Sequence, residues 1–263
     1  SGPGTDIMEG GLRQDTGSGK KCGIEAGEKD EAEKRRTGMF IDLHMHEMRN
    51  SGDSFLPLEE IVEIAKKKGL DAICITDHDN MDIREFAREY SEKTGFPIFV
   101  GIEFYSLQGD IIAFGVREYP RERISAQAFI NLVREQGGVC YSAHPFRNNR
   151  RGMEEHLDEV TGLSGIEVLN GSTHREACLT AAAYAKKLNL IPVGASDCHV
   201  PEKVGVCATY FPLEIRSEED LVRAFKTGGM KPAYYEDGAY HIVDIDAPES
   251  EFPDEVWMKK SAR

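Results

Sequence analysis

Long hydrophobic runs and paired cysteine motifs are absent from this sequence. No apolar run approaches the roughly 20 residues that a membrane-spanning helix requires, and no apolar segment near the N-terminus resembles a signal peptide. The six cysteines include no Cys-x-x-Cys pair, and several lie within apolar stretches. We therefore expect buried, reduced thiols in a cytoplasmic protein that has no membrane partner.

Nucleotide-binding fingerprints and an excess of positive charge are also absent. Neither the Gly-x-Gly-x-x-Gly pattern nor the phosphate-binding loop pattern ending in Gly-Lys-Ser/Thr occurs. The formal net charge of -14 at pH 7 argues against nonspecific binding to nucleic acid or to an anionic membrane. A small anionic substrate stays compatible with this charge, because metal ions would create a strong positive field locally.

The two ends of the chain differ in composition from its middle. Residues 1–38 are rich in glycine and charge and nearly free of large apolar side chains, so we expect a disordered leader or a cloning remnant. Residues 236–263 are acidic and mostly aperiodic, and we expect an appended tail. Residues 39–235 remain as one domain, and the hydrophobic content of 40% is adequate for a sizeable core.

Strand and helix signals alternate through this middle region. An apolar run at 39–46 precedes a helix that Pro57 opens and Gly69 closes, and Ser125 and Ser217 are expected to cap later helices. The pattern gives about seven strand–helix units, with strands apolar on both faces, as is typical of parallel strands covered by helices. It predicts a closed or nearly closed α/β barrel, with a doubly wound open sheet as the alternative.

Side chains that commonly bind metal ions fall at the carboxyl ends of successive predicted strands. In a barrel these ends converge on one face, so residues far apart in sequence could share one pocket. Imidazoles and carboxylates without a thiolate suit divalent Zn, Mn or Fe. The candidate ligands are His44, His46, His78, Glu103, His144, Asp197 and His199.

The His-x-His pair is informative because side chains two apart on a strand point the same way. His44 and His46 could bind one ion side by side, while Asp42 orients a ligand from behind. Each motif alone admits a simpler interpretation. The sequence TDHD, which contains His78, also fits a solvated turn in which Asp79 caps the next helix.

Two further motifs place charge beside apolar strands. Glu103 interrupts the run PIFVGIEFY, where a carboxylate is unfavourable to bury without a partner, and a position bridging two cations would offset that burial. Asp197 and His199 repeat the spacing of the His-x-His pair and place Cys198 on the opposite face, where packing is a better role for the thiol than ligation.

The segments DLHMH, TDHD, GIE, SAHP and SDCH, in this order and spacing, resemble the PHP (polymerase and histidinol phosphatase) superfamily of metal-dependent phosphoesterases. The resemblance covers about residues 39–235 and implies a distorted (β/α)7 TIM-like barrel. It also implies two or three divalent ions (Mn, Zn or Fe). The first would be held by His44, His46, Glu103 and Asp197, the second by Glu103 and His144, and the third by His78, His199 and Asp53.

One position departs from the family pattern. Many members place a histidine on the strand after the bridging glutamate, in a stretch similar to HILAFG. This chain reads DIIAFG, so Asp110 takes the matching position. A carboxylate is a workable but harder ligand than imidazole, and it would change how the second ion is held.

The resemblance implies hydrolysis of a small phosphate monoester, such as a nucleotide, a nucleoside bisphosphate or histidinol phosphate, by a hydroxide that two ions share. Asp77 or a metal-bound water would give a proton to the leaving oxygen. Arg147 is placed to grip the phosphate with its forked guanidinium, or it is a solvated loop residue. His174 either faces the pocket mouth or caps the helix that follows it.

Other functions stay open on the sequence alone. A free-standing 3'→5' exonuclease on short oligonucleotides is one, although the acidic balance favours a small phosphorylated metabolite and no stable nucleic-acid complex. A regulatory module whose site has decayed is another, and the Asp110 departure lends it weight. Metal-dependent amide or lactone hydrolysis is a third, since related barrels carry out that chemistry.

Overall fold

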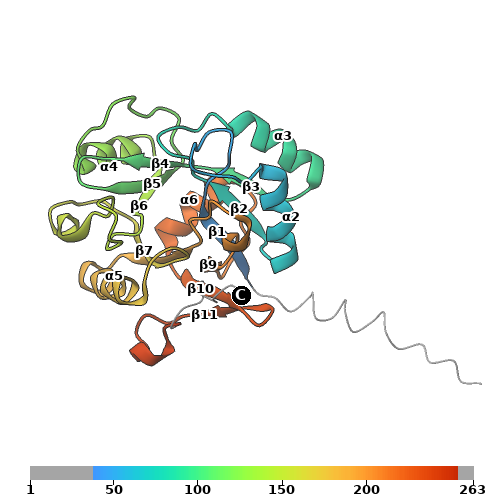
Figure 1. The fold of residues 1–263 in the computed structure, drawn as a ribbon. Coiled ribbons are helices and arrows are strands. Elements are labelled where there is room, and N and C mark those ends of the chain that lie inside the picture. The colour runs from blue at the N-terminus through green and yellow to red at the C-terminus, as the bar shows by residue number, and fades with distance from the viewer. Residues whose placement is uncertain (1–37, 254–263) are drawn as a thin grey trace, which may run out of the picture. The chain divides into compact units, whose positions relative to one another are not determined.

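The computed structural model describes residues 38–253, which form a mixed α/β fold with helices around two sheets (Figure 1). The helices are α2 (Leu58–Lys68), α3 (Arg84–Thr94), α4 (Ala126–Glu135), α5 (Arg175–Leu188) and α6 (Glu218–Thr227). Short 3-10 helices occur in the connections, as η1 (Glu154–Asp158), η2 (Pro201–Lys203) and η3 (Glu249–Glu251).

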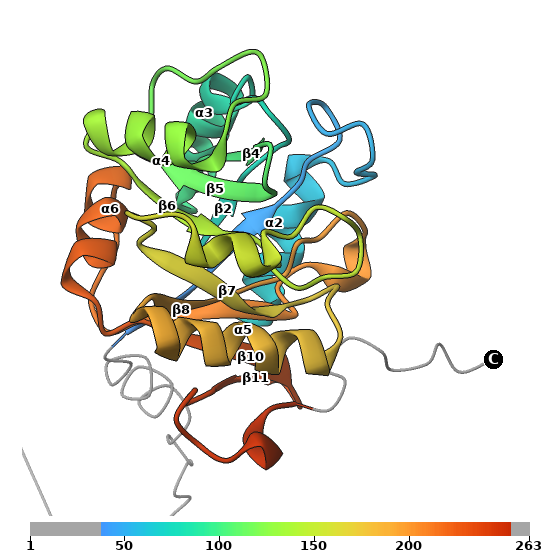
Figure 2. The ribbon, with the colours of Figure 1, turned by 90° about the vertical axis from the view of Figure 1, so that its left-hand side faces the viewer.

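The strands belong to two hydrogen-bonded sheets. The first sheet has the order β11 (Ala239–Ile242), β10 (Lys231–Glu236), β9 (Cys207–Phe211), β1 (Met39–Met45), β2 (Ala72–Ile75) and β3 (Ile98–Val100). The second has the order β4 (Ile102–Tyr105), β5 (Asp110–Phe114), β6 (Val139–Ser142), β7 (Gly165–Asn170) and β8 (Ile191–Ala195). Figure 2 shows α5 lying along β7 and β8.

The strand pairing corrects the prediction of uniformly parallel strands. β1 pairs in parallel with β2, and β6 with β7, but β5 is antiparallel to both β4 and β6. The reason is the connection between β4 and β5, a short turn that lacks the crossover helix a parallel pair requires. Within residues 38–253 the backbone ladders form two sheets and not one closed ring.

Two short seams, in each of which backbone groups of one sheet pair with those of the other, lie at the candidate metal ligands. At the first, His78 and Glu103 form an isolated parallel bridge, and the Glu103 N–H donates to the Asp77 carbonyl at 3.2 Å. At the second, the Asp197 N–H donates to the His44 carbonyl at 2.8 Å. Several candidate ligands therefore lie on the segments whose backbone hydrogen bonds connect the two sheets.

A side chain links the sheets at a third point. The Thr209 hydroxyl on β9 accepts from the Gly194 N–H at 3.0 Å and donates to the Gly194 carbonyl at 2.8 Å. A Cβ on Gly194 would lie 2.5 Å from the Ala208 carbonyl oxygen, so only glycine permits this close approach of β8 and β9. One hydroxyl thus satisfies both backbone groups of a residue between the sheets.

Helix ends follow the capping signals in the sequence. α2 follows Pro57 and ends at Gly69, whose φ of 76° is the left-handed conformation that glycine tolerates. The hydroxyls of Ser125 and Ser217 accept from the backbone N–H groups three residues later, at 3.2 Å in each case. The connection after β6 contains only the short 3-10 helix η1 before β7 begins.

The core consists of two clusters of buried side chains. The larger cluster lies between the strands and the outer helices and includes Ile61 of α2 and Phe129 of α4. The smaller combines strands of both sheets with α6, through residues such as Ile41, Tyr141 and Phe225. Burial on both strand faces explains why the strands are apolar throughout.

The ends of the chain lie partly outside the described residues. The expected leader, residues 1–38, falls almost entirely outside them, and its character stays a prediction. The expected tail from residue 236 begins at the last residue of β10 and includes β11, which pairs with β10 and extends the first sheet. No helix in the described part of the chain is long and apolar enough to cross a membrane. The five described cysteines are buried and free.

Candidate metal centre

The structure brings the His-x-His pair together with Asp197. The Nε2 atoms of His44 and His46 lie 3.0 Å apart, and both imidazoles are fully buried. Asp197 Oδ1 lies 3.4 Å from each of these nitrogen atoms. Two imidazole nitrogens and a carboxylate oxygen therefore point at one small volume from β1 and from the loop after β8.

Glu103 occupies the middle of the cluster. Its Oε1 lies 2.9 Å from His144 Nε2 and 3.4 Å from His44 Nε2. Its Oε2 lies 2.7 Å from His78 Nδ1 and 3.4 Å from His46 Nε2. One buried carboxylate thus contacts four imidazoles, and its role in bridging two ions stays a prediction.

A third group of ligand atoms lies nearer the surface. Asp53 Oδ2 is 3.2 Å from His78 Nε2 and 3.3 Å from His199 Nε2. The rings of His78 and His199 each stack on His46, with centroids 4.3 Å apart. The structure therefore brings Asp53 to the edge of the cluster.

Three sets of side chains could each hold one ion, with ligand atoms within 4.8 Å of one another. Their nitrogen and carboxylate donors suit divalent transition metals. The sets are His46, His78 and His199; His44, Glu103 and His144; and His44, His46 and Asp197.

Hydrogen bonds behind the His-x-His pair show that the site fits a cation. The Ser51 hydroxyl donates to Asp77 Oδ1 at 2.9 Å, so it accepts from His46 Nδ1 at 3.2 Å. His44 Nδ1 lies 3.1 Å from Glu167 Oε1 and donates to that carboxylate. The Nε2 atom of each ring therefore carries no hydrogen and has a free lone pair, and the two lone pairs face each other. A cation or proton shared between them would stabilise this arrangement.

The pKa values of His44 and His46 are shifted in opposite directions. Burial lowers the pKa of His46 to about 4. Burial also acts to lower the pKa of His44, but Asp197, Glu103 and Glu167 together raise it well above its usual value. In the absence of an ion, one proton therefore stays on His44 and faces the neutral His46. A divalent ion would replace this proton as the cation among the carboxylates.

The pKa values of Glu103, Asp197 and His78 are shifted by the charges of the same cluster. Burial opposes ionisation of Glu103 and Asp197, yet His44 and further positive partners hold the pKa of both well below the usual range. Burial also acts to lower the pKa of His78, but hydrogen bonding and charge from Glu103 raise it to about 9. The two carboxylates are therefore ionised already, and His78 carries the proton that an incoming metal ion would displace.

The backbone is strained at two of the candidate ligands. His144 has a φ of 27° and Asp197 a φ of 51°, both in the left-handed region that residues other than glycine rarely adopt. Such strain persists only where the surroundings enforce it, and it concentrates at functional sites. The turn in each case directs the side chain from the end of its strand into the cluster.

Several residues that the sequence analysis did not single out support the ligands. Glu167 Oε2 accepts from the His144 N–H at 2.6 Å and from Asn170 Nδ2 at 2.9 Å. Glu167 stands in the segment GIEVLN, and its tripeptide GIE repeats the one around Glu103. A charged residue inside an apolar strand was therefore the signal by which it could have been found.

Asp42 and Asp77 lie behind the cluster. Asp42 accepts from the backbone N–H groups of Ser196 at 3.0 Å and His44 at 3.3 Å, which ties the two ligand-bearing segments together. Asp77 supports His46 through Ser51. Burial raises the pKa of both carboxyls to about 7. The predicted role of Asp77 as a proton donor stays a prediction.

The arginine predicted to bind phosphate lies against the cluster. Arg147 donates to Thr173 Oγ1 at 3.0 Å and also contacts Asn170 and Asp197. It is therefore not a freely solvated loop residue. His174 is placed differently, because it is exposed and precedes α5 without capping that helix through its side chain. The structure does not bring His174 into the cluster.

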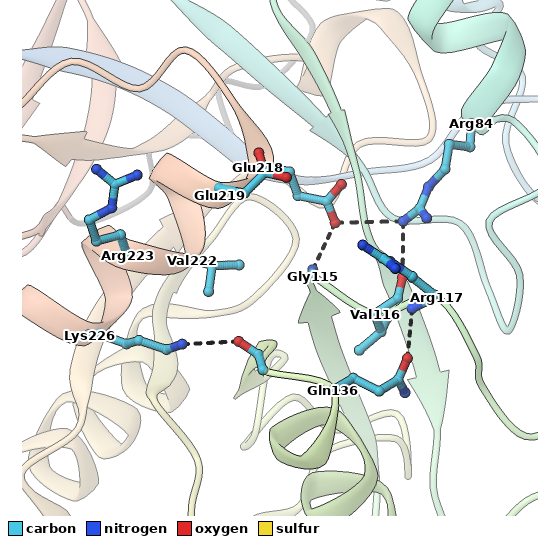
Figure 3. A pocket seen from close by; sticks show the side chains of 11 residues that line it. Arg84, Gly115, Val116, Arg117, Gln136, Glu218, Glu219, Val222, Arg223 and Lys226 are labelled. Carbon is cyan, nitrogen blue, oxygen red and sulfur yellow. Dashed lines mark hydrogen bonds and ion pairs between the residues drawn. The ribbon is translucent and has the colours of Figure 1, made fainter.

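A recess of about 670 Å³ lies away from these residues (Figure 3). It opens beside the end of β5 and the start of β6, whereas the cluster lies at the opposite ends of these strands. Some of its charged groups have local partners: Glu218 accepts from the Gly115 N–H at 2.8 Å and faces Arg84, and Lys226 donates to the Gly137 carbonyl at 3.0 Å. We therefore place the functional site at the histidine cluster.

Family models identify the class of protein. The PHP domain model matches residues 42–201, and the PHP-associated model matches residues 175–229. The chain therefore belongs to the PHP superfamily, as its motifs predicted. An uncharacterized protein of Methanocaldococcus jannaschii is 26% identical over 163 residues, which cover 59% of this chain and 94% of that protein. A PolC-type DNA polymerase III of Lacticaseibacillus paracasei is 30% identical over 142 residues, covering 54% of this chain and 8% of the polymerase.

Solved structures share the fold. A two-domain protein from Bacteroides vulgatus, containing a predicted PHP-like metal-dependent phosphoesterase, has a TM-score of 0.60 and 21% identity over 75% of this chain and 65% of that one. A lesion-specific endonuclease from Pyrococcus furiosus has a TM-score of 0.60 and 17% identity over 74% of this chain and 57% of that one. The chain spans less than two thirds of either structure.

Proposed function

We propose that the protein is a metal-dependent phosphoesterase that hydrolyses a small phosphate monoester, such as a nucleotide, a nucleoside bisphosphate or a histidinol-phosphate-like metabolite. One observation carries the proposal: the buried Glu103 carboxylate contacts four imidazoles, drawn from both sheets. Four imidazoles around one buried carboxylate are a donor set that suits divalent metal ions. The chain also belongs to the PHP superfamily, and a similar solved structure contains a predicted metal-dependent phosphoesterase.

The candidate ligands would hold two or three divalent ions (Mn, Zn or Fe). Such ions would activate a water molecule as nucleophile and neutralise charge on the transferring phosphate oxygens. The residues supply rigidity: Glu167 and Ser51 keep the Nδ1 atoms of His44 and His46 occupied, so that the Nε2 atoms stay directed at the cluster. The ligands need little rearrangement on binding.

Arg147 would bind the substrate phosphate. Its guanidinium is partly buried and held by Thr173 and Asn170 beside Asp197. A planar guanidinium that is already oriented loses little entropy when it grips a phosphate oxygen. The net charge of -14 favours a small substrate over a long nucleic acid, because the rest of the protein would repel an extended polyanion.

The test is phosphate release from a panel that contains histidinol phosphate, a nucleoside 3',5'-bisphosphate and a short oligonucleotide, with Mn²⁺ and again after chelation. We expect turnover of a monoester that needs metal and that falls by at least about 100-fold in His46→Ala. His156→Ala is the matched control, because His156 is an exposed histidine that pairs with Glu159. Metal-loaded protein that turns over no phosphate ester would exclude the proposal.

A further inference from the structure

Asp110, which stands where the family pattern has a metal-binding histidine, is engaged by an arginine. Arg151 Nε donates to Asp110 Oδ2 at 2.6 Å, and Arg151 Nη2 donates to Asp110 Oδ1 at 2.9 Å. The pair is therefore bidentate, the strongest geometry for a guanidinium and a carboxylate. Asp110 is fully buried, so its charge requires such a partner.

The backbone holds the two residues together as firmly as the side chains do. The Asp110 N–H donates to the Arg151 carbonyl at 2.7 Å. A Cβ on Gly152 would lie 2.1 Å from the Pro145 carbonyl oxygen, and a Cβ on Gly109 would lie 2.7 Å from Gly152. The loop after His144 is thus folded tightly onto the start of β5, and glycine at these positions permits the contact.

An aromatic ring also lies against the guanidinium. The Arg151 carbon Cζ lies 4.3 Å from the centroid of the Tyr105 ring, and Arg123 lies against the same ring at 3.6 Å. Arg151 Nη2 reaches to 3.5 Å from His78 Nδ1 at the edge of the cluster. Tyr105 and Asp110 therefore orient Arg151 toward the candidate metal centre.

The carboxylate of Asp110 is occupied by Arg151 although it lies beside the cluster. His144 Nε2 lies 3.7 Å from Asp110 Oδ2 and 2.9 Å from Glu103 Oε1. None of the three groups of ligand atoms found among the described residues contains Asp110. Both carboxylate oxygens already accept strong hydrogen bonds from Arg151.

We propose that Asp110 is not a metal ligand in this protein, and that it instead fixes Arg151 as a permanent cation beside the metal centre, where Arg151 binds the phosphate of the substrate. The guanidinium takes the place of an ion at this position, so the centre holds one ion fewer than the full family pattern implies. The part of this inference that concerns substrate rests on the proposed function, whereas the part that concerns metal content does not.

Metal content tests the role of Asp110 without any assay of activity. Wild-type protein, Asp110→Asn and Asp197→Asn are loaded with Mn²⁺, freed of excess metal, and measured by elemental analysis, with folding checked by circular dichroism. We expect Asp110→Asn to keep the wild-type metal content and Asp197→Asn, the matched control, to lose about one ion per chain. A loss of about one ion in Asp110→Asn would overturn the inference.

A second variant decides the question if Asp110→Asn does not fold. Arg151→Met keeps the length and apolar stem of the side chain but frees the Asp110 carboxylate next to Glu103 and His144. We expect this variant to gain about one Mn²⁺ ion per chain at saturating metal. Unchanged metal content in folded Arg151→Met would show that the arginine does not take the place of an ion, and would overturn the inference.

Kinetics test the role of Arg151 toward substrate. With the best ester of the panel, Arg151→Lys is expected to raise KM by about 10-fold or more with kcat within a few-fold of wild type, because a lysine loses the fork but keeps the charge. An unchanged KM would refute phosphate binding by Arg151. If no ester is hydrolysed by wild type, the proposed function fails while the metal measurements still decide the role of Asp110.

Discussion

Glu167 joins two candidate ligands that come from different sheets. Its Oε1 lies 3.1 Å from His44 Nδ1, and its Oε2 accepts from the backbone N–H of His144 at 2.6 Å. Both carboxylate oxygens are buried with their partners. One side chain on β7 therefore sets the ring orientation of His44 and the strained turn at His144 together.

Glu167→Gln is expected to weaken metal binding by about 10- to 100-fold without unfolding the protein. The amide keeps the shape of the side chain, but it loses the negative charge and one of the two acceptor oxygens. Competition with a fluorescent chelator measures the affinity. Glu159→Gln is the control, since Glu159 is an exposed carboxylate that pairs with the exposed His156. Equal affinity in Glu167→Gln and wild type would rule out this positioning role.

Metal affinity is expected to increase with pH up to about 9. The pKa of His78 is raised to about 9, so in metal-free protein the imidazole is protonated below that value and an incoming ion must displace the proton. The apparent affinity should fall by up to roughly tenfold per pH unit, for each proton displaced, as the pH decreases. Chelator competition between about pH 6 and pH 9 checks this. His78→Asn should make the dependence shallower by about one proton, because the proton on His44 must still be displaced. A flat wild-type profile would contradict it.

Thr209→Val is expected to destabilise the protein by roughly 2 kcal/mol or more. The change removes the hydroxyl that bonds both backbone groups of Gly194 and leaves a buried donor and a buried acceptor without partners. Thr209→Ser keeps the hydroxyl and serves as the control. Urea unfolding of both variants measures the difference, and equal stability of the two would show that the link between β8 and β9 is not needed.

Asp42 should make metal-free protein less stable as the pH rises. Burial raises the pKa of Asp42 from 3.8 unfolded to about 7 folded, so between these values the folded state binds the extra proton. The free energy of unfolding then decreases as the pH rises through this window, by up to roughly 4 kcal/mol for this group.

The measurement is urea unfolding of metal-free wild type and Asp42→Asn at the two ends of that window. Asp42→Asn retains an oxygen that can accept from the Ser196 N–H but does not titrate, so its stability should decrease less with pH. Asp77 contributes a similar dependence in both proteins, because its pKa is also raised to about 7. Identical pH profiles of wild type and variant would refute this account of Asp42.

The residue types and their order along the chain were sufficient to predict which candidate ligands lie together, because strand ends can be recognised locally. The helix caps at Ser125 and Ser217 were predictable for the same reason, since a cap depends on residues three apart. The antiparallel β5 was not anticipated. β5 is antiparallel because the short connection between β4 and β5 contains no helix, whereas strands and helices alternate through much of the rest of the chain.

The sequence by itself determined the candidate ligands, the family and the alternation of strands and helices, because each depends on local patterns. Only the tertiary structure decided that Glu167 orients His44, that Arg151 engages Asp110, and that two short seams join the sheets at the ligands. These relationships join segments that are distant in sequence. They depend on side-chain packing and on the balance between burial and pairing of charge, which no local pattern encodes.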